Sequence, residues 1–205
     1  VPSTVLGTPT LSGSAPVTGT TAATHDSNPA NNSTTQAITV AAPDMSVSLA
    51  GLPATAAVGV PYTGSFSCSN VGTADATGAT RCSVTGLPSG LSVGACTISP
   101  SGTPWSEAAS VPAGATVTCP VSGTPTALGS STVTGTTGAT SDSNTANNTD
   151  TRAITVSAPD MSISLAGLPS TAAVGTPYTG SFTCTNGGGA DATAGTLCSV
   201  AGLPA

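Results

Sequence analysis

The chain has 205 residues and a net charge of −6, with only 5% charged and 2% aromatic residues. Arg81 and Arg152 are its only cations, which excludes the clustered Lys and Arg needed to bind nucleic acid or an anionic membrane. It contains no run of 18 apolar residues, so we expect no membrane insertion in this segment. Ser, Thr, Ala and Gly dominate the rest, but alternating runs, a long repeat and spaced cysteines argue against a disordered linker.

A repeat of 116 residues organises the whole chain. Residues 41–89 match residues 157–205 at 36 of 49 positions, and residues 1–40 match residues 117–156 at 26 of 40. We therefore expect three pieces: the C-terminal part of one unit (1–40), a complete unit (41–156) and the N-terminal part of the next unit (157–205). Similar units joined without a linker indicate a tandem array, of which this chain is a window.

Seven strands are predicted in the complete unit, taken in chain order. They cover residues 45–49, 60–70, 80–85, 91–99, 115–121, 130–137 and 151–156. Alternation is clearest in the second strand, where Tyr62, Phe66 and Cys68 share one face, and in the fifth, where Val117, Cys119 and Val121 do. Residues 100–114 are predicted to form a long loop that carries Trp105, an anchor over the core rather than a sugar platform. No segment has helical periodicity, so the pattern predicts an all-β fold of antiparallel β-sandwiches.

The order of several short motifs resembles the bacterial conserved-repeat domain of unknown function with an Ig-like fold, found in tandem in large secreted and surface proteins. The matching features are Asp44, AVGVPYTGSF (57–66), Asn70 with Gly72, GLPSGL (86–91), VPAGATVT (111–118), and Asp142 with Asn147 and Asn148. The resemblance implies an Ig-like fold and an extracellular structural or adhesive role, and it brings no catalytic residues. Four cysteines per unit and the near-absence of charge depart from that family.

The cysteines are predicted to form disulfides rather than a zinc site. They are Cys68, Cys82, Cys96, Cys119, Cys184 and Cys198, without any CxxC pair, and His25 is the only histidine. Cys68 and Cys82 face inward at similar height, which favours Cys68–Cys82 with Cys96–Cys119, and Cys184–Cys198 as a copy of the first pair. The rival set is Cys82–Cys96 with Cys68–Cys119. Either set places the protein in an oxidising compartment, so we expect an extracellular or cell-surface location.

The loop DSNTANN (142–148), repeated as DSNPANN (26–32), is a weak calcium candidate. Asp142, Asn144 and Asn147 supply oxygen atoms, but each loop has one carboxylate, and Asp and Asn commonly cap their own turns. We therefore expect no metal and no cofactor. Asn31, Asn32 and Asn147 stand in N-x-S/T sequences, the acceptors of N-glycosylation in eukaryotic secretory proteins. Because the resemblance is to a bacterial family, we expect these sequences to arise by chance in a Thr-rich loop.

Function is predicted to be structural rather than enzymatic. Position 25 is His in one unit and Ser141 in the next, so no Asp–His pair recurs that could activate a serine or threonine. The leading hypothesis is an extracellular fibre, filament, sheath or surface layer, whose partners are head-to-tail copies of the chain. The alternative is an adhesin stalk or ligand-binding surface protein of the same repeats. Both partial units would expose apolar faces, so either the chain continues or a neighbouring copy completes them.

Overall fold

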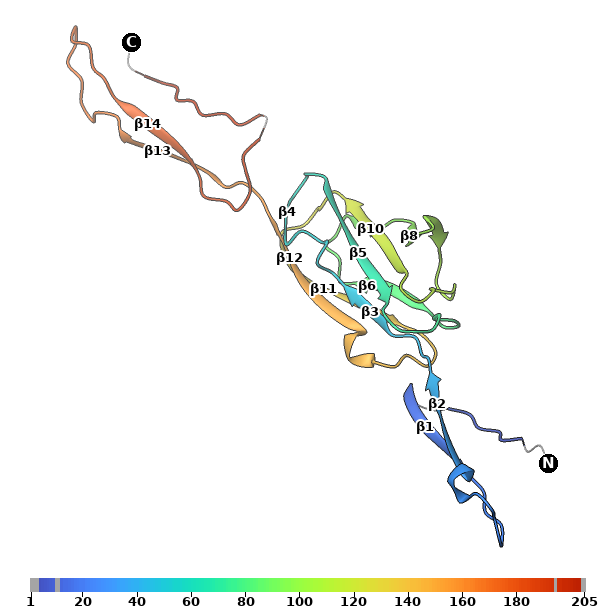
Figure 1. Ribbon diagram of the computed structural model, residues 1–205. Coiled ribbons are helices and arrows are strands. Elements are labelled where there is room, and N and C mark those ends of the chain that lie inside the picture. Colours follow the sequence, from blue (N-terminus) through green and yellow to red (C-terminus); the bar gives the residue numbers. More distant parts are fainter. Residues whose placement is uncertain (1–3, 10–11, 194, 204–205) are drawn as a thin grey trace.

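The computed structural model describes residues 4–9, 12–193 and 195–203 of the chain. Within these ranges the protein is all β and has no α-helix; its only helical turns are the 3-10 turns Pro29–Asn31 and Thr145–Asn147. A central sandwich is flanked by two hairpins that project from its opposite ends (Figure 1). The prediction of an all-β sandwich fold is confirmed.

The central sandwich consists of two sheets. The first contains, in spatial order, β3 (Met45–Ser48), β5 (Tyr62–Asn70), β10 (Thr116–Gly123), β8 (Cys96–Ser99) and β9 (Thr103–Trp105), with β7 (Leu91–Val93) also paired to β10. The second contains β4 (Thr55–Ala57), β12 (Thr149–Ser157), β11 (Gly129–Gly138) and β6 (Arg81–Thr85). All pairings are antiparallel except β4 with β12, which is parallel and corrects the expectation of purely antiparallel sheets.

The core lies between the sheets, where the alternating strands place every second side chain. β5 and β10 alternate as predicted, and their inward residues are buried together with inward residues of β3, β11 and β12. The largest fully buried core side chains are Met45, Leu49, Leu52, Phe66, Val111, Val117, Val121, Val133 and Ile154. The outward positions of the same strands are mostly Ser and Thr, so the surface is covered by hydroxyl groups rather than charges.

Ten strands, not seven, build the central sandwich. Each predicted segment contains a strand, but β4 and β9 were not predicted. β4 has no large side chain to reveal a buried face, and its partner Thr155–Ser157 lies about 100 positions away in the sequence. β9 was predicted as part of a loop because Pro100 and Gly102 lie just before it and Pro104 lies within it. It is an edge strand, where a proline is tolerated because one side of the strand needs no donor.

The predicted strand 91–99 is divided in two by a β-bulge. Val121 is opposite Val93, whereas Thr118 is opposite Thr97, so the 91–99 side has one extra residue between these pairs. Pro120 lies opposite the bulge and has no N–H to donate, while its carbonyl accepts a hydrogen bond from the Gly94 N–H at 2.8 Å. The bulge therefore lets a proline occupy an interior strand of the sheet.

The flanking hairpins repeat strands of the sandwich. β1 (Gly13–Thr20) pairs with β2 (Ser33–Val40) and occupies the repeat positions of β11 and β12. β13 (Met161–Gly167) pairs with β14 (Ser181–Asn186) and occupies the positions of β3 and β5. Residues 41–44 alone separate β2 from β3, and residues 158–160 alone separate β12 from β13.

Candidate functional site

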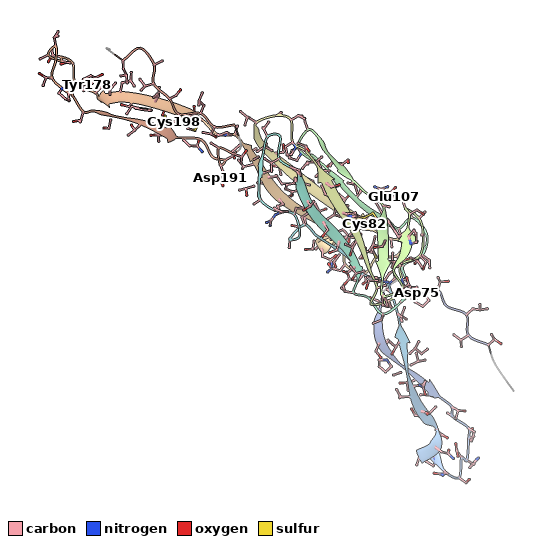
Figure 2. All side chains as sticks on the ribbon, turned by 90° about the horizontal axis from the view of Figure 1, so that it is seen from above. Asp75, Cys82, Glu107, Tyr178, Asp191 and Cys198 are labelled. Carbon is pink, nitrogen blue, oxygen red and sulfur yellow. A yellow bond between two sulfur atoms is a disulfide. The ribbon has the colours of Figure 1, made fainter. Side chains whose placement is uncertain are left out.

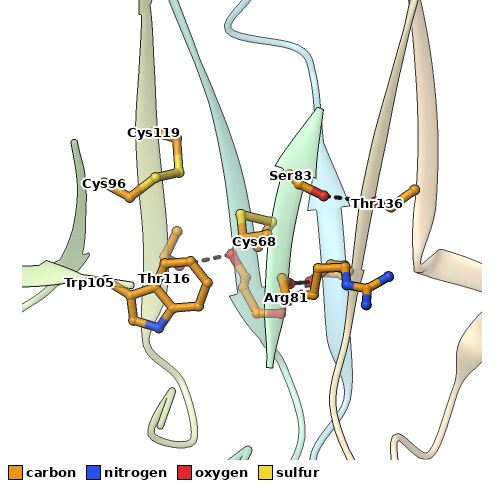
Figure 3. Close-up of a disulfide and its surroundings, with 12 residues drawn as sticks. Cys68, Arg81, Ser83, Cys96, Trp105, Thr116, Cys119 and Thr136 are labelled. Carbon is orange, nitrogen blue, oxygen red and sulfur yellow. Dashed lines mark hydrogen bonds between the residues drawn. A yellow bond between two sulfur atoms is a disulfide. The ribbon is translucent and has the colours of Figure 1, made fainter. Parts of the chain in front are cut away.

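Three disulfides join the six cysteines. Cys68 of β5 bonds to Cys82 of β6 with an S–S distance of 2.00 Å, so this bond ties the two sheets together. Cys96 of β8 bonds to Cys119 of β10 at 1.97 Å, within one sheet (Figure 3). Cys184 and Cys198 form the third bond, with the sequence separation of 14 that the first bond also has. Of the two sets of pairings considered from the sequence, the structure has the first.

Trp105 belongs to the core rather than to an exposed platform. It lies on β9 directly opposite Cys96 and beside the Cys96–Cys119 bond (Figure 3). The side chain is 8% exposed, and its indole N–H donates to the carbonyl oxygen of Ala109 at 3.3 Å. The anchoring role predicted for Trp105 fits this position, although it is a strand residue and not a loop residue.

The loop 142–148 fastens the end of the central sandwich to its beginning. The carboxylate of Asp142 accepts hydrogen bonds from the backbone N–H groups of Met45, at 3.3 Å, and of Asn144, at 3.2 Å. Asn147 donates from its side-chain amide to the carboxylate of Asp44 at 2.9 Å. Asn144 accepts from the N–H of Ala146 and caps the 3-10 turn. The side-chain oxygens of Asp142 and Asn144 are thus engaged in turn capping and in holding Met45. Asn147 holds Asp44 through its amide nitrogen, and its own Oδ1 is buried without a hydrogen-bond partner.

The corresponding loop 26–32 caps its own turn in a similar way. Asp26 accepts from the N–H of Asn28 at 3.0 Å, and this bond, with a second from the Asn32 side chain, holds the pKa of Asp26 below its ordinary value. His25 and Ser141 share a left-handed backbone conformation, with φ of 63° and 62°. His25 is exposed in this turn, as expected for a solvated loop residue.

Ionisable groups are dispersed over the surface. Figure 2 shows Asp191 at the opposite end of the central sandwich from Asp75 and Glu107. Within the part of the chain that the structure describes, no three His, Cys, Asp or Glu side chains come close enough to hold a metal ion together. A cavity of about 640 Å³ lies at Ile98–Ser101 and Pro112–Ala115, and its lining carries no charged or aromatic side chain. Among the described residues, no helix combines the length and apolarity needed to cross a membrane.

The two hairpins expose the apolar faces that the sandwich buries. Val133 and Ile154 of the second sheet are fully buried, whereas their counterparts Val17 and Ile38 are 52% and 51% exposed. Leu49 is fully buried, and its counterpart Leu165 is 48% exposed. Equivalent repeat positions are therefore covered in the sandwich and uncovered in the hairpins.

Two important polar residues were not recognised from the sequence as structural. Asn70 is 1% exposed and donates to the carbonyls of Ala74 and Val111, while it accepts from the N–H groups of Asp44 and Gly72. Asp150 accepts from the N–H of Leu49 at 2.8 Å and so links β12 to the residue that directly follows β3. The recurrence of Asn70 as Asn186 was the available signal, but Asp150 is Thr34 in the other copy and left none.

No protein-family model matches the chain, and no curated protein matches it. Among solved structures, the crystallised CARDB domain of a Pyrococcus furiosus protein, described in complex with di-metal ions, has 19% identity and a TM-score of 0.39, covering 56% of this chain and 88% of that one. A solution structure of that domain has 22% identity, a TM-score of 0.37, and coverage of 56% and 94%. Domains 4 and 5 of the S-layer protein SbsC have 18% identity, a TM-score of 0.33, and coverage of 60% and 58%. At these TM-scores the similarities carry no argument about function.

Proposed function

We propose that the chain is part of a tandem array of Ig-like sandwich units, 1–40, 41–156 and 157–205, that serves as a structural protein of an extracellular fibre, filament, sheath or surface layer. The observation that carries this proposal is the central sandwich itself, closed by two disulfides and continued on both sides by the strands of its own repeat. Disulfides persist in oxidising compartments, which supports a location outside the cytosol.

The short links support a structural role for the array. The strands of neighbouring units are separated only by residues 41–44 and by residues 158–160. Each of these links contains a proline, Pro43 or Pro159, that restricts its backbone. Cys68–Cys82 joins the two sheets across the core, and Cys96–Cys119 holds the β8–β9 edge to β10. Covalent bonds at these positions suit a module with few large core side chains that has to stay folded outside the cell.

Location and thiol state of the native protein test the proposal together. An antibody raised against residues 41–157 is applied to intact cells and to permeabilised cells, after free thiols have been alkylated. We expect labelling of intact cells, and disulfide-linked peptides containing Cys68 with Cys82 and Cys96 with Cys119. Labelling that requires permeabilisation, or alkylated cysteines at these four positions, would contradict an extracellular structural role.

A further inference from the structure

We infer that each unit has a docking surface for the link that comes from the unit before it, and that this contact makes neighbouring units stiff relative to each other. The surface is formed mainly by residues 70–74, named the clamp loop here, which recur as residues 186–190 in the next unit. The inference deepens the proposed structural role and rests on it, because it states how successive units of one chain are held.

The clamp loop binds the backbone of the first link. The N–H of Thr73 donates to the carbonyl of Ala42 at 3.0 Å, and the N–H of Val71 donates to the carbonyl of Asp44 at 2.8 Å. The side chain of Asn70 accepts from the N–H of Asp44 at 3.2 Å. From Ala42 onward, the first link is therefore fastened to the unit that follows it.

Pro43, in the middle of the first link, is buried. Its carbonyl accepts a hydrogen bond from the N–H of Ser143 at 2.9 Å, so a second loop of the same unit also holds the link. A buried backbone group without a partner is costly, and the proline ring fixes one backbone dihedral of the link. The link therefore has little freedom to change its direction.

The preceding unit holds the other side of a link. At the second link, β4 pairs with the end of β12, and Ala57 lies opposite Ser157. The N–H of Val58 donates to the carbonyl of Ser157 at 2.9 Å. Ser157 occupies the repeat position of Ala41, directly before the segment that the clamp loop binds. In a tandem array, the last residue held by one unit and the first residue held by the next are thus consecutive.

The second link is bound by its own clamp loop in the same way. Asn186, the counterpart of Asn70, accepts from the N–H of Asp160 at 3.0 Å. The N–H of Gly187 donates to the carbonyl of Asp160 at 2.8 Å. These contacts repeat those of Asn70 and Val71 with Asp44, so the arrangement belongs to the repeat and not to one junction.

A glycine in each clamp loop lets it approach the link closely. A Cβ atom on Gly72 would lie 2.6 Å from the carbonyl carbon of Pro43, and one on Gly188 would lie 2.7 Å from the carbonyl carbon of Pro159. Glycine is the residue that permits such close approach of two backbones. Any side chain at these two positions has to push the link away from the clamp loop.

Side-chain packing between the central sandwich and the hairpin that follows is interrupted. A cleft of about 390 Å³ lies there, lined by residues 55–57 on one side and residues 189–191 on the other. Small interfaces ordinarily leave domains free to move. The orientation of one unit against the next therefore depends on the hydrogen bonds on either side of the Ser157–Ala158 peptide bond.

Residual dipolar couplings of the 205-residue polypeptide test the inference, because they report the orientations of N–H bonds relative to one another. They are measured for β2, the central sandwich and β13. The deciding variant is Gly188→Ala, which forces the second clamp loop off its link. Gly187→Ala is its matched control, because a Cβ atom there would have only the carbonyl oxygen of Asp160 near it, at 3.9 Å. Gly72→Ala and Val71→Ala give the same comparison at the first link, with Trp105 fluorescence as the check that the central sandwich is folded.

In the wild type and both controls, we expect the couplings of β2, the sandwich and β13 to fit one alignment tensor. Gly188→Ala should release β13 alone, and Gly72→Ala should release β2 alone, so that the couplings of the released strand leave the common fit and fall toward zero. Separate tensors in the wild type, or a single tensor in Gly188→Ala, would overturn the inference. Gly188 lies outside the central sandwich, so this variant does not depend on the sandwich tolerating a substitution. None of these results changes the cell-surface labelling or the disulfide map, which test the proposed function separately.

Discussion

Leu49, the residue directly after β3, lies over Gly135 of β11 across the core of the sandwich. A methyl group on Gly135 would lie only 2.8 Å from Cδ2 of Leu49, so the two residues are in close contact. Leu49 is also fixed through its backbone, since its N–H donates to Asp150 at 2.8 Å. The repeat offers Leu165 as a matched residue with the same neighbours in sequence and an uncovered side chain.

Leu49→Ala should therefore destabilise the central sandwich far more than Leu165→Ala does. Removing a fully buried leucine side chain leaves a cavity and costs about 2–5 kcal/mol of unfolding free energy. At Leu165 the change should stay within about 0.5 kcal/mol, since the side chain is half exposed. Urea unfolding of dilute protein, followed through Trp105 fluorescence, measures both. Equal losses in the two variants would contradict the assigned burial.

Sequence patterns predicted the strands whose two faces differ and missed those that depend on distant partners. Alternation located β5 and β10 because Phe66, Cys68 and Val117 face a core while their neighbours face water. β4 could not be found in this way, since three small residues gain their strand conformation from the end of β12. The bulge opposite Pro120 follows from a missing N–H donor, and this signal was present in the sequence but could be read only once β10 had neighbours on both sides.

Candidate sites followed the same rule. Spacing and inward direction were enough to suggest how the cysteines pair, because those properties are local to each strand. The role of Asp142 was only half accessible: capping of its own turn is a local property, but the bond to the N–H of Met45 joins residues that are 97 positions apart. For the same reason, nothing in the sequence around Asp150 indicated its bond to Leu49.

Removal of the inter-sheet disulfide should lower stability by about 3 kcal/mol, the value expected for closing a loop of about 15 residues. The variant is Cys68→Ala with Cys82→Ala, and the matched control is Cys184→Ala with Cys198→Ala, whose sequence separation is also 14. The control bond lies outside the central sandwich, so unfolding observed at Trp105 should not change. The assignment fails if the control lowers the unfolding midpoint as much as the first variant does.

Asp142→Ala should destabilise the sandwich equally with calcium and with a chelator. The substitution leaves the N–H groups of Met45 and Asn144 without their acceptor, which costs about 1–3 kcal/mol. Asp26→Ala is the control, because its loop does not touch β3 in this chain, and Trp105-detected unfolding should be unaffected. The thermal midpoint is measured in about 5 mM calcium, a concentration that would fill a weak extracellular site, and again in excess chelator. A midpoint that rises with calcium in the wild type but not in Asp142→Ala would establish a metal site.

Tyr62 should make the sandwich less stable in alkali. Burial raises the pKa of Tyr62, and the positive charge of Arg152 offsets part of that rise. Because the folded state holds the phenol proton more tightly than the unfolded state does, stability is fully present below the ordinary tyrosine pKa of about 10 and falls as the pH rises beyond it. Tyr62→Phe should flatten this alkaline decline. At neutral pH Tyr62→Phe should cost about 1 kcal/mol of unfolding free energy, since the phenol O–H donates to the carbonyl of Pro53 at 3.0 Å.

The control is Tyr178→Phe, at the repeat position outside the sandwich. It should change neither the alkaline decline nor the stability at neutral pH. Urea unfolding between pH 7 and 11 measures all three proteins, and an equal alkaline decline in the wild type and Tyr62→Phe would exclude Tyr62 as its source.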